Sequence, residues 1–128
     1  MNLFNSGFFK LHSGDMSLFK IDCDHLTAED YDALAVVVAS KYSFSEVEGI
    51  PTGGLAFAEA LKKHITKDSP YLLLVDDVLT TGGSMKRRRK ELEKSSHFLV
   101  QGVVVFARGK CPWWITPILN LNEKFRKV

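Results

Sequence analysis

Apolar runs alternate along this chain with glycine-containing turns and helix-forming segments. The clearest run has four consecutive aliphatic residues, too few for a helix: Leu72, Leu73, Leu74 and Val75. Such a run, bounded by turn-forming residues, predicts a strand that is buried on both faces. Asp76 and Asp77 follow where the strand should emerge, and a helix is predicted from Met85 onward. The order is strand, acidic pair, glycine loop and helix.

Two further segments extend this pattern. Residues 44–50 alternate briefly and then meet a Pro-Thr-Gly-Gly turn and a helix-forming run, and residues 98–106 form another apolar strand that ends before Arg108. Strands beginning near Ser45, Tyr71 and Phe98, with helices between them, predict an α/β fold with a small parallel sheet flanked by helices. Both glycine loops and Arg108 then fall at the carboxyl ends of strands, where open α/β sheets bind their ligands.

The remaining segments complete a single predicted domain, residues 1–128. The first 24 residues alternate short apolar runs with turns and predict two short strands, a hood over residues 1–26. The core spans residues 27–109 and opens with an N-capped helix from Thr27. The tail, residues 110–128, is apolar enough to dock on the sheet, and Trp113 and Trp114 are interpreted as core cover or a dimer contact rather than as base-stacking residues.

Composition narrows the class of protein. The chain has 128 residues with 45% hydrophobic content, enough for one domain with a core of its own. Cys23 and Cys111 have no paired spacing, so we expect neither a disulfide nor a zinc site, and a cytoplasmic location fits best. No apolar run approaches the ~20 residues of a membrane span. A net charge of +2 suits an anionic substrate and does not by itself indicate nucleic acid.

The glycine loop after the acidic pair has the chemistry of a phosphate site. Free N–H groups at a helix start carry partial positive charge, and the hydroxyls of Thr80, Thr81 and Ser84 add donors. Carboxylates would repel the same phosphate, so Asp76 and Asp77 are better placed to accept sugar hydroxyls or to surround a metal. The implied ligand is a phosphorylated sugar. The alternative is an ordinary Asp-capped turn between a strand and a helix.

Residues 75–84 resemble the 5-phosphoribosyl-1-diphosphate (PRPP) motif of type I phosphoribosyltransferases. The resemblance implies a Rossmann-like fold of that family and a catalytic acidic pair, Asp76 and Asp77, that holds the ribose hydroxyls. It implies that the 5-phosphate end of PRPP is bound by the residues that follow: Val78, Leu79, Thr80, Thr81, Gly82, Gly83 and Ser84.

The earlier glycine loop is similar to the pyrophosphate loop of the same family. Its residues are Ile50, Pro51, Thr52, Gly53 and Gly54. An ordinary tight turn that uses Pro and Gly is the alternative. Neither loop matches G-x-x-x-x-G-K-[ST] or G-x-G-x-x-G, which argues against a P-loop NTPase and against a dinucleotide-binding domain.

The N-terminal segment resembles the hood of orotate phosphoribosyltransferases, with a plain hairpin as the alternative. The resemblance implies that the base is contacted by Phe9, His12, Ser13, Gly14, Phe19 and Arg108. Two positions depart from the orotate pattern. His12 stands where those enzymes usually carry a lysine, and Ala107 replaces an acidic residue.

The segment before the central strand is short. Orotate enzymes place a further strand and a mobile loop with a catalytic cation there, whereas this chain has only residues 64–70. Lys67 is interpreted as part of a solvated turn, with a remnant of that loop as the alternative. A missing lid should leave the leaving group less well neutralised. The basic run of residues 86–90 is interpreted as a solvated helix face; attraction of polyphosphate, nucleic-acid binding and a subunit contact stay open.

These resemblances imply transfer of ribose 5-phosphate from PRPP to a nucleobase of the orotate type, as in pyrimidine biosynthesis, with Mg²⁺ and release of pyrophosphate. A non-catalytic PRPP-binding regulatory module is the alternative. A homodimer is expected, because the deletion would leave an open sheet edge. Nucleic acid is an unlikely partner, since aromatic residues are not interleaved with the basic run.

Overall fold

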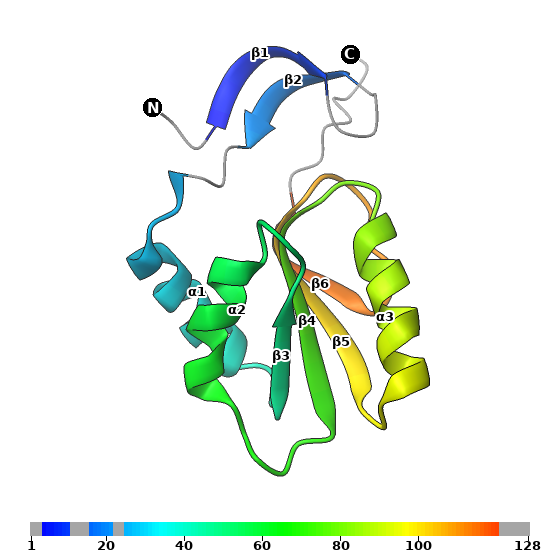
Figure 1. The fold of residues 1–128 in the computed structure, drawn as a ribbon. Coiled ribbons are helices and arrows are strands. Elements are labelled where there is room, and N and C mark those ends of the chain that lie inside the picture. Colours follow the sequence, from blue (N-terminus) through cyan, green and yellow to red (C-terminus); the bar gives the residue numbers. More distant parts are fainter. Residues whose placement is uncertain (1–3, 11–15, 22–24, 121–128) are drawn as a thin grey trace.

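The computed structural model describes residues 4–10, 16–21 and 25–120 and contains two sheets (Figure 1). The smaller sheet is an antiparallel pair, β1 (Phe4–Lys10) and β2 (Met16–Ile21). The larger sheet is parallel throughout, in the order β3-β4-β5-β6, and consists of β3 (Glu46–Gly49), β4 (Tyr71–Leu79), β5 (Leu99–Ala107) and β6 (Ile115–Asn120). The α/β fold class predicted from the sequence is confirmed, including the short N-terminal strands.

Helices cover both faces of the parallel sheet. Two of them, α1 (Ala28–Ala39) and α2 (Leu55–Leu61), lie on one face, and α3 (Gly83–Ser95) lies on the other (Figure 1). Consecutive residues of β4 therefore serve two cores. Leu73 packs with the α1 and α2 side, whereas Leu72 and Leu74 pack with the α3 side. This two-sided burial explains the continuous apolar run, because neither face of the strand meets water.

Helix α1 begins where the sequence predicts it. The hydroxyl of Thr27 accepts a hydrogen bond from the N–H of Asp30 at 3.1 Å, and the Asp30 carboxylate accepts one from the N–H of Thr27 at 2.8 Å. This reciprocal capping box satisfies two N–H groups that have no acceptor within the helix. It fixes the point at which the chain enters the core.

The fourth parallel strand, β6, was not predicted as a strand. The sequence gives its residues as an apolar tail, and the structure pairs Ile115 with Gly102 of β5. Trp114, which is buried, packs on Gly102, where a Cβ would lie 2.8 Å from the indole ring. The guanidinium of Arg89 lies 5.0 Å from the ring centre of Trp113 and 4.8 Å from that of Trp114, which ties the β5–β6 connection to α3. Core cover is thus confirmed for Trp114, while Trp113 is 84% exposed.

The short segment before β4 lies at the amino ends of the strands. Residues 62–70 contain a 3-10 helix, η2 (Lys62–His64), and a turn, and the N–H of Thr66 donates to the carbonyl of Phe44 at 2.7 Å. Figure 1 shows this loop at the opposite end of the sheet from residues 50–54 and 80–82. Lys67 is exposed in this turn, as predicted.

Candidate functional site

The carboxyl edge of the parallel sheet gathers the predicted site. The first glycine loop, residues 50–54, follows β3, and the second glycine loop, residues 80–84, follows β4. The N–H of Ile50 donates to the carbonyl of Val75 at 2.9 Å, and the N–H of Arg108 donates to the carbonyl of Leu79 at 3.1 Å. Backbone bonds of this kind hold the ends of three neighbouring strands together, so the two loops and Arg108 open on one side of the molecule.

The acidic pair belongs to β4 itself, whereas the sequence places it where the strand ends. Strand pairing continues past Asp76, opposite Val104, as far as Leu79, opposite Ala107. Oδ1 of Asp76 accepts the N–H of Asp77 at 2.8 Å, and Oδ1 of Asp77 accepts the N–H of Val78 at 2.7 Å. These bonds fix one oxygen of each carboxylate. Both side chains are half-buried and not sealed within the core, as the sugar-binding hypothesis requires.

Asp76 is electrostatically unusual. Burial raises its pKa from 3.8 to about 7, and the hydrogen bond and negative charge of Asp77 add to the rise. When a carboxyl is poorly solvated and faces a second carboxylate, its ionised form is stabilised by a ligand that supplies hydroxyl donors or a cation. Perturbed carboxyls in such a position are characteristic of binding and catalytic sites.

The second glycine loop keeps an open backbone. Gly82 has φ of 79°, the left-handed conformation that glycine adopts without strain. At the start of α3, the N–H of Gly83 donates to Oγ1 of Thr81 at 3.4 Å. Lys86 is the first residue whose N–H finds an acceptor in the helix, Gly82 O at 2.9 Å. The N–H groups of Ser84 and Met85 precede that bond and point toward the loop. The loop can thus receive an anion, and Thr80, Thr81 and Ser84 are exposed beside it.

Two of the predicted phosphate-loop residues have side chains that pack in the cores. The side chain of Leu79 is buried in the α3-side core, and that of Val78 packs against the opposite core.

The first glycine loop lies directly against Asp77 of the acidic pair. A Cβ on Gly53 would lie 2.4 Å from Oδ2 of Asp77, so the carboxylate rests against the bare backbone of the loop. A Cβ on Gly54 would lie 2.5 Å from the carbonyl oxygen of Val75. The peptide between Pro51 and Thr52 is cis. Glycines at positions 53 and 54 therefore allow the loop to fold down onto the end of β4.

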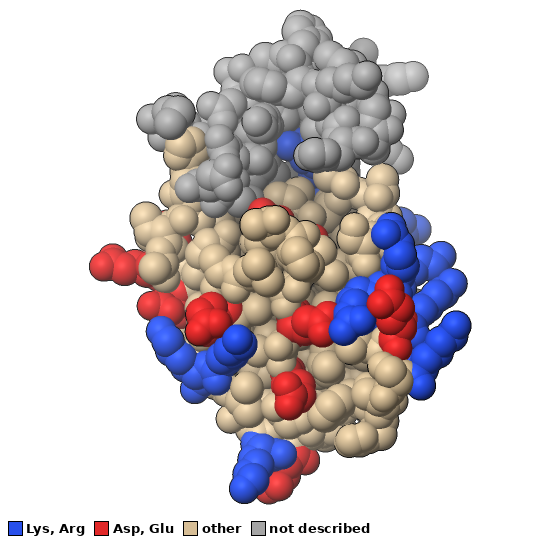
Figure 2. Space-filling view, in the orientation of Figure 1, with Lys and Arg blue, Asp and Glu red and all other residues tan. Residues whose placement is uncertain are grey.

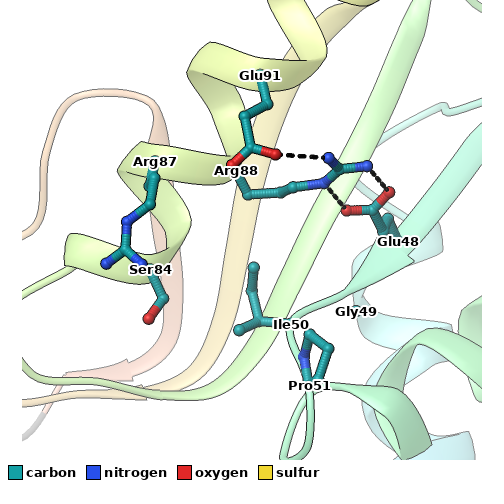
Figure 3. Close-up of a pocket in the computed structure, with 8 residues that line it drawn as sticks. All are labelled: Glu48, Gly49, Ile50, Pro51, Ser84, Arg87, Arg88 and Glu91. Carbon is teal, nitrogen blue, oxygen red and sulfur yellow. Dashed lines mark hydrogen bonds and ion pairs between the residues drawn. The ribbon is translucent and has the colours of Figure 1, made fainter.

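A cavity of about 580 Å³ lies between β3 and α3 and borders both glycine loops (Figure 3). We call it the β3–α3 cavity; it is lined by Glu48, Gly49, Ile50, Pro51, Ser84, Arg87, Arg88 and Glu91. Its size falls within the range of small-molecule sites, about 300–1,000 Å³. The sequence analysis did not place Glu48 or Glu91 in a site. The sequence does contain a signal for this cavity. Ser84, Arg87, Arg88 and Glu91 have helical spacing, which puts them on one face of the helix that starts at the second glycine loop.

The basic run of residues 86–90 is divided among several environments. Blue side chains gather along the edge of the molecule formed by α3 (Figure 2). Lys86, Arg87 and Lys90 are exposed, whereas Arg89 pairs with Glu93 at 3.1 Å. Arg88 binds Glu48 of β3 through two hydrogen bonds. The predicted solvated face thus describes part of the run, and two of its arginines line the β3–α3 cavity.

The predicted base-binding residues are described only in part. His12, Ser13 and Gly14 lie outside the described residues. Phe9 and Phe19 lie on β1 and β2, which Figure 1 places beyond the carboxyl edge of the parallel sheet. Arg108 directly follows β5 at that edge and is half-buried. The backbone thus brings the hood strands and Arg108 to the same end of the molecule as the glycine loops.

Metal ligands and membrane helices can be judged for the described residues alone. Within residues 4–10, 16–21 and 25–120, no three His, Cys, Asp or Glu side chains cluster as a metal site would require. In the same part of the chain, every helix is too short or too polar to cross a bilayer.

Sequence comparison finds relatives with one shared name. The chain is 30% identical over 138 residues to the orotate phosphoribosyltransferase of Pyrobaculum aerophilum, covering 82% of this chain and 69% of the relative. It is 29% identical over 126 residues to the orotate phosphoribosyltransferase of Methanocorpusculum labreanum, covering 80% of this chain and 75% of the relative. No protein-family model matches the chain.

Solved structures agree on the fold. The orotate phosphoribosyltransferase of Aeropyrum pernix superposes with a TM-score of 0.70 at 23% identity, over 92% of this chain and 88% of that one. The Mycobacterium tuberculosis enzyme in complex with PRPP gives 0.65 at 18% identity, over 88% and 86%.

Proposed function

Because the chain belongs to the orotate phosphoribosyltransferase family, we propose that it transfers the ribose 5-phosphate group of PRPP to a ring nitrogen of an orotate-like base and releases pyrophosphate. The observation that carries the proposal is the contact between the first glycine loop and the acidic pair at the end of β4. Asp77 of β4 rests against Gly53 of the first loop, directly before the second loop begins. One ligand with a phosphate, a diol and a diphosphate would engage all three features together.

Each part of the site meets a different part of PRPP in this proposal. The amides and hydroxyls of residues 80–84 bind the 5-phosphate, because they provide donors at a helix start. The carboxylates of Asp76 and Asp77 accept hydrogen bonds from the ribose hydroxyls. The backbone of residues 50–54 faces the diphosphate, and Arg108 contacts the base.

The chemistry follows from this placement. The bond between C1 and the base nitrogen forms while the bond between C1 and the diphosphate oxygen breaks. The electron pair leaves with the diphosphate, and the proton of the base nitrogen passes to solvent. The sugar carries positive charge at the transition state, so the site acts by holding the reacting atoms in line and by neutralising the leaving group. None of these steps needs a protein nucleophile.

The acidic pair could hold Mg²⁺ together with PRPP. Asp76 and Asp77 are two carboxylates, fewer than a complete ligand set, so oxygens of PRPP would complete the coordination. Bound Mg²⁺ would supply positive charge to the departing diphosphate. The rise in the pKa of Asp76 supports this assignment, because a carboxylate with that environment is stabilised by a cation.

The test is release of pyrophosphate from PRPP in the presence of Mg²⁺ and a panel of bases, namely orotate, uracil, hypoxanthine and adenine. We expect turnover with orotate that is lost in the Asp76→Asn, Asp77→Asn double variant. Equal rates in the wild-type protein and the double variant, or no release with any base at high enzyme concentration, would contradict catalysis at this site.

A second candidate function is a PRPP-binding module without turnover. It is favoured by the place of residues 62–70, which form a short turn at the amino edge and so provide no lid over the diphosphate. Tight Mg²⁺-dependent PRPP binding in calorimetry, combined with no pyrophosphate release, would select it.

A homodimer and a cytoplasmic location complete the proposal. Strand β3 pairs only with β4 among the described residues, which leaves its other edge unpaired in that part of the chain. Light scattering of the purified chain measures the subunit count; a monomer at micromolar concentration would remove the dimer from the proposal.

A further inference from the structure

Arg87 is a cation of the β3–α3 cavity whose charge no described residue compensates. It lines the cavity together with Pro51 of the first glycine loop and Ser84 of the second. Its side chain is exposed, and within the described residues it makes no hydrogen bond or ion pair. In Figure 3 it extends along α3 toward Ser84, at the start of the helix. Helical side chains lean toward the N-terminus, so this direction is the usual one.

The other charged residues of the cavity, Glu48, Arg88 and Glu91, form ion pairs with one another. Nη2 of Arg88 donates to Oε1 of Glu48 at 2.9 Å, and Nη1 donates to Oε2 of Glu91 at 3.0 Å. Figure 3 shows the guanidinium of Arg88 crossing the cavity to Glu48, away from Arg87. Both carboxylates of the cavity are therefore engaged by Arg88. Arg87 remains available for an anionic ligand.

Apart from Arg87, no described side chain next to the first glycine loop offers the diphosphate a positive charge that is not already paired. The first glycine loop has only uncharged residues: Ile50, Pro51, Thr52, Gly53 and Gly54. Residues 62–70 cannot supply a cation to the diphosphate, because they lie at the far end of the sheet. Arg108 and the exposed Lys110 follow β5, which lies on the other side of β4 from the first loop. The 5-phosphate, in contrast, has the amides and hydroxyls of the second loop.

We propose that Arg87 neutralises the diphosphate of PRPP from the β3–α3 cavity and so takes over, from within the core fold, the charge that a lid would otherwise bring. This inference rests on the proposed function. A guanidinium suits the task because it stays charged at any working pH and can donate two parallel hydrogen bonds to phosphate oxygens. Stabilising the charge that develops on a leaving group acts mainly on kcat.

The chain offers a matched control one residue away. Lys86 carries the same charge in the same helical turn and is exposed like Arg87, but it does not line the cavity. We would compare Arg87→Ala, Arg87→Lys and Lys86→Ala in pyrophosphate release, and measure the binding of Mg²⁺-pyrophosphate and of ribose 5-phosphate by calorimetry. Far-ultraviolet circular dichroism and thermal unfolding confirm that each variant is folded.

The expected result has three parts. Arg87→Ala lowers kcat by at least about tenfold, since removing one preorganised charge-stabilising donor commonly costs ~100-fold or more and this one is exposed. It weakens pyrophosphate binding but leaves ribose 5-phosphate binding unchanged, and Arg87→Lys recovers part of both losses. Lys86→Ala behaves as the wild type at 0.15 M salt, where charges farther apart than about 8 Å are screened.

Three outcomes would overturn the inference. If the wild type turns over PRPP and Arg87→Ala matches Lys86→Ala, then Arg87 has no role and the proposed function stands without it. If Arg87→Ala loses ribose 5-phosphate binding and retains pyrophosphate binding, then Arg87 binds the 5-phosphate instead. The inference then fails, and the proposed function stands. If the wild type neither binds PRPP nor releases pyrophosphate, the proposed function and the inference fail together.

Discussion

The carboxylate of Asp77 lies against the backbone of Gly53, in the space where any other residue would carry its Cβ. This contact joins the acidic end of β4 to the first glycine loop. It predicts that alanine substitutions at Gly53 and at Gly54 have different effects on ligand binding and on stability.

Gly53→Ala should impair binding more than folding. The new Cβ would meet the end of a side chain, 2.4 Å from Oδ2 of Asp77, and that carboxylate can turn away. We expect a change of less than about 1 kcal/mol in the free energy of unfolding. PRPP affinity, measured by calorimetry, should fall at least about tenfold, or ~1.4 kcal/mol, because the displaced carboxylate no longer meets the ribose.

Gly54→Ala is the comparison. Its Cβ would meet backbone atoms, Val75 O at 2.5 Å and Ile50 N at 2.7 Å, which cannot turn away. Overpacking of this kind should destabilise the fold by about 2 to 3 kcal/mol in denaturant titration. Similar stability losses in the two variants would show that the Asp77 carboxylate is not free to move.

Asp76→Asn should stabilise the protein without ligand at neutral pH. Burial raises the pKa of Asp76 from 3.8 to about 7, so the folded protein holds a proton that the unfolded chain has already released. The stability linked to that proton is complete below about pH 4 and is lost as the pH rises toward and past 7. The asparagine variant should therefore exceed the wild type by about 1 to 2 kcal/mol at pH 8, a value reduced for the partial exposure of the carboxyl.

The measurement is urea unfolding of both proteins at pH 4.5 and pH 8. Asp68→Asn is the control, because Asp68 is exposed in the turn at the far end of the sheet, and it should change stability by less than about 0.5 kcal/mol at both pH values. An Asp76→Asn protein that is less stable than the wild type at pH 8 would contradict the assigned burial of this carboxyl.

The second glycine loop should tolerate asparagine better than alanine at position 82. Gly82 has φ of 79°, which costs a residue with an ordinary Cβ about 1–2 kcal/mol and costs asparagine less. Thermal unfolding should rank the proteins as wild type, Gly82→Asn and Gly82→Ala in order of decreasing stability. Equal melting temperatures for the two variants would mean that the loop relaxes out of the left-handed conformation.

The Arg88–Glu48 pair should contribute modestly to stability by holding α3 to β3. The two side chains are 38% and 34% exposed, so a double-mutant cycle with Arg88→Met and Glu48→Gln should give a small stabilising coupling that exceeds the coupling of an exposed control pair. The Lys62–Glu59 pair, 56% and 75% exposed, is the control and should give a coupling near zero. A coupling for Arg88–Glu48 no larger than that of the control would leave the pair without a structural role.

Most of the fold could be predicted from the sequence, because local signals mark its strands and helices clearly. The aliphatic run of β4 needs two covered faces, and the capping box of Thr27 marks the start of α1 by local hydrogen bonds alone. Strand β6 escaped prediction for a physical reason. It contains Pro117 and polar residues typical of an exposed edge, and its pairing depends on the contact between Trp114 and Gly102, which joins residues distant in the chain.

The candidate site was predictable where one loop holds the chemistry. The acidic pair and the glycines of the second loop lie within nine residues, so their order alone suggested a phosphorylated sugar. The β3–α3 cavity was not predictable, because Glu48 and Arg88 are 40 residues apart and meet only when β3 and α3 pack on β4. Arg87 and Arg88 look alike in the basic run, and only the structure shows that one is paired and the other faces the cavity without a partner among the described residues.

Calorimetric titration of the protein with PRPP in the presence of Mg²⁺ tests the central claim most directly, with the Asp76→Asn, Asp77→Asn double variant as its counterpart. We expect one PRPP per chain, binding that depends on Mg²⁺, and a loss of at least about 100-fold in affinity, or ~2.7 kcal/mol, in the double variant. Unchanged affinity in the double variant, or no heat of binding to the wild type, would contradict the placement of a sugar phosphate between the acidic pair and the two glycine loops.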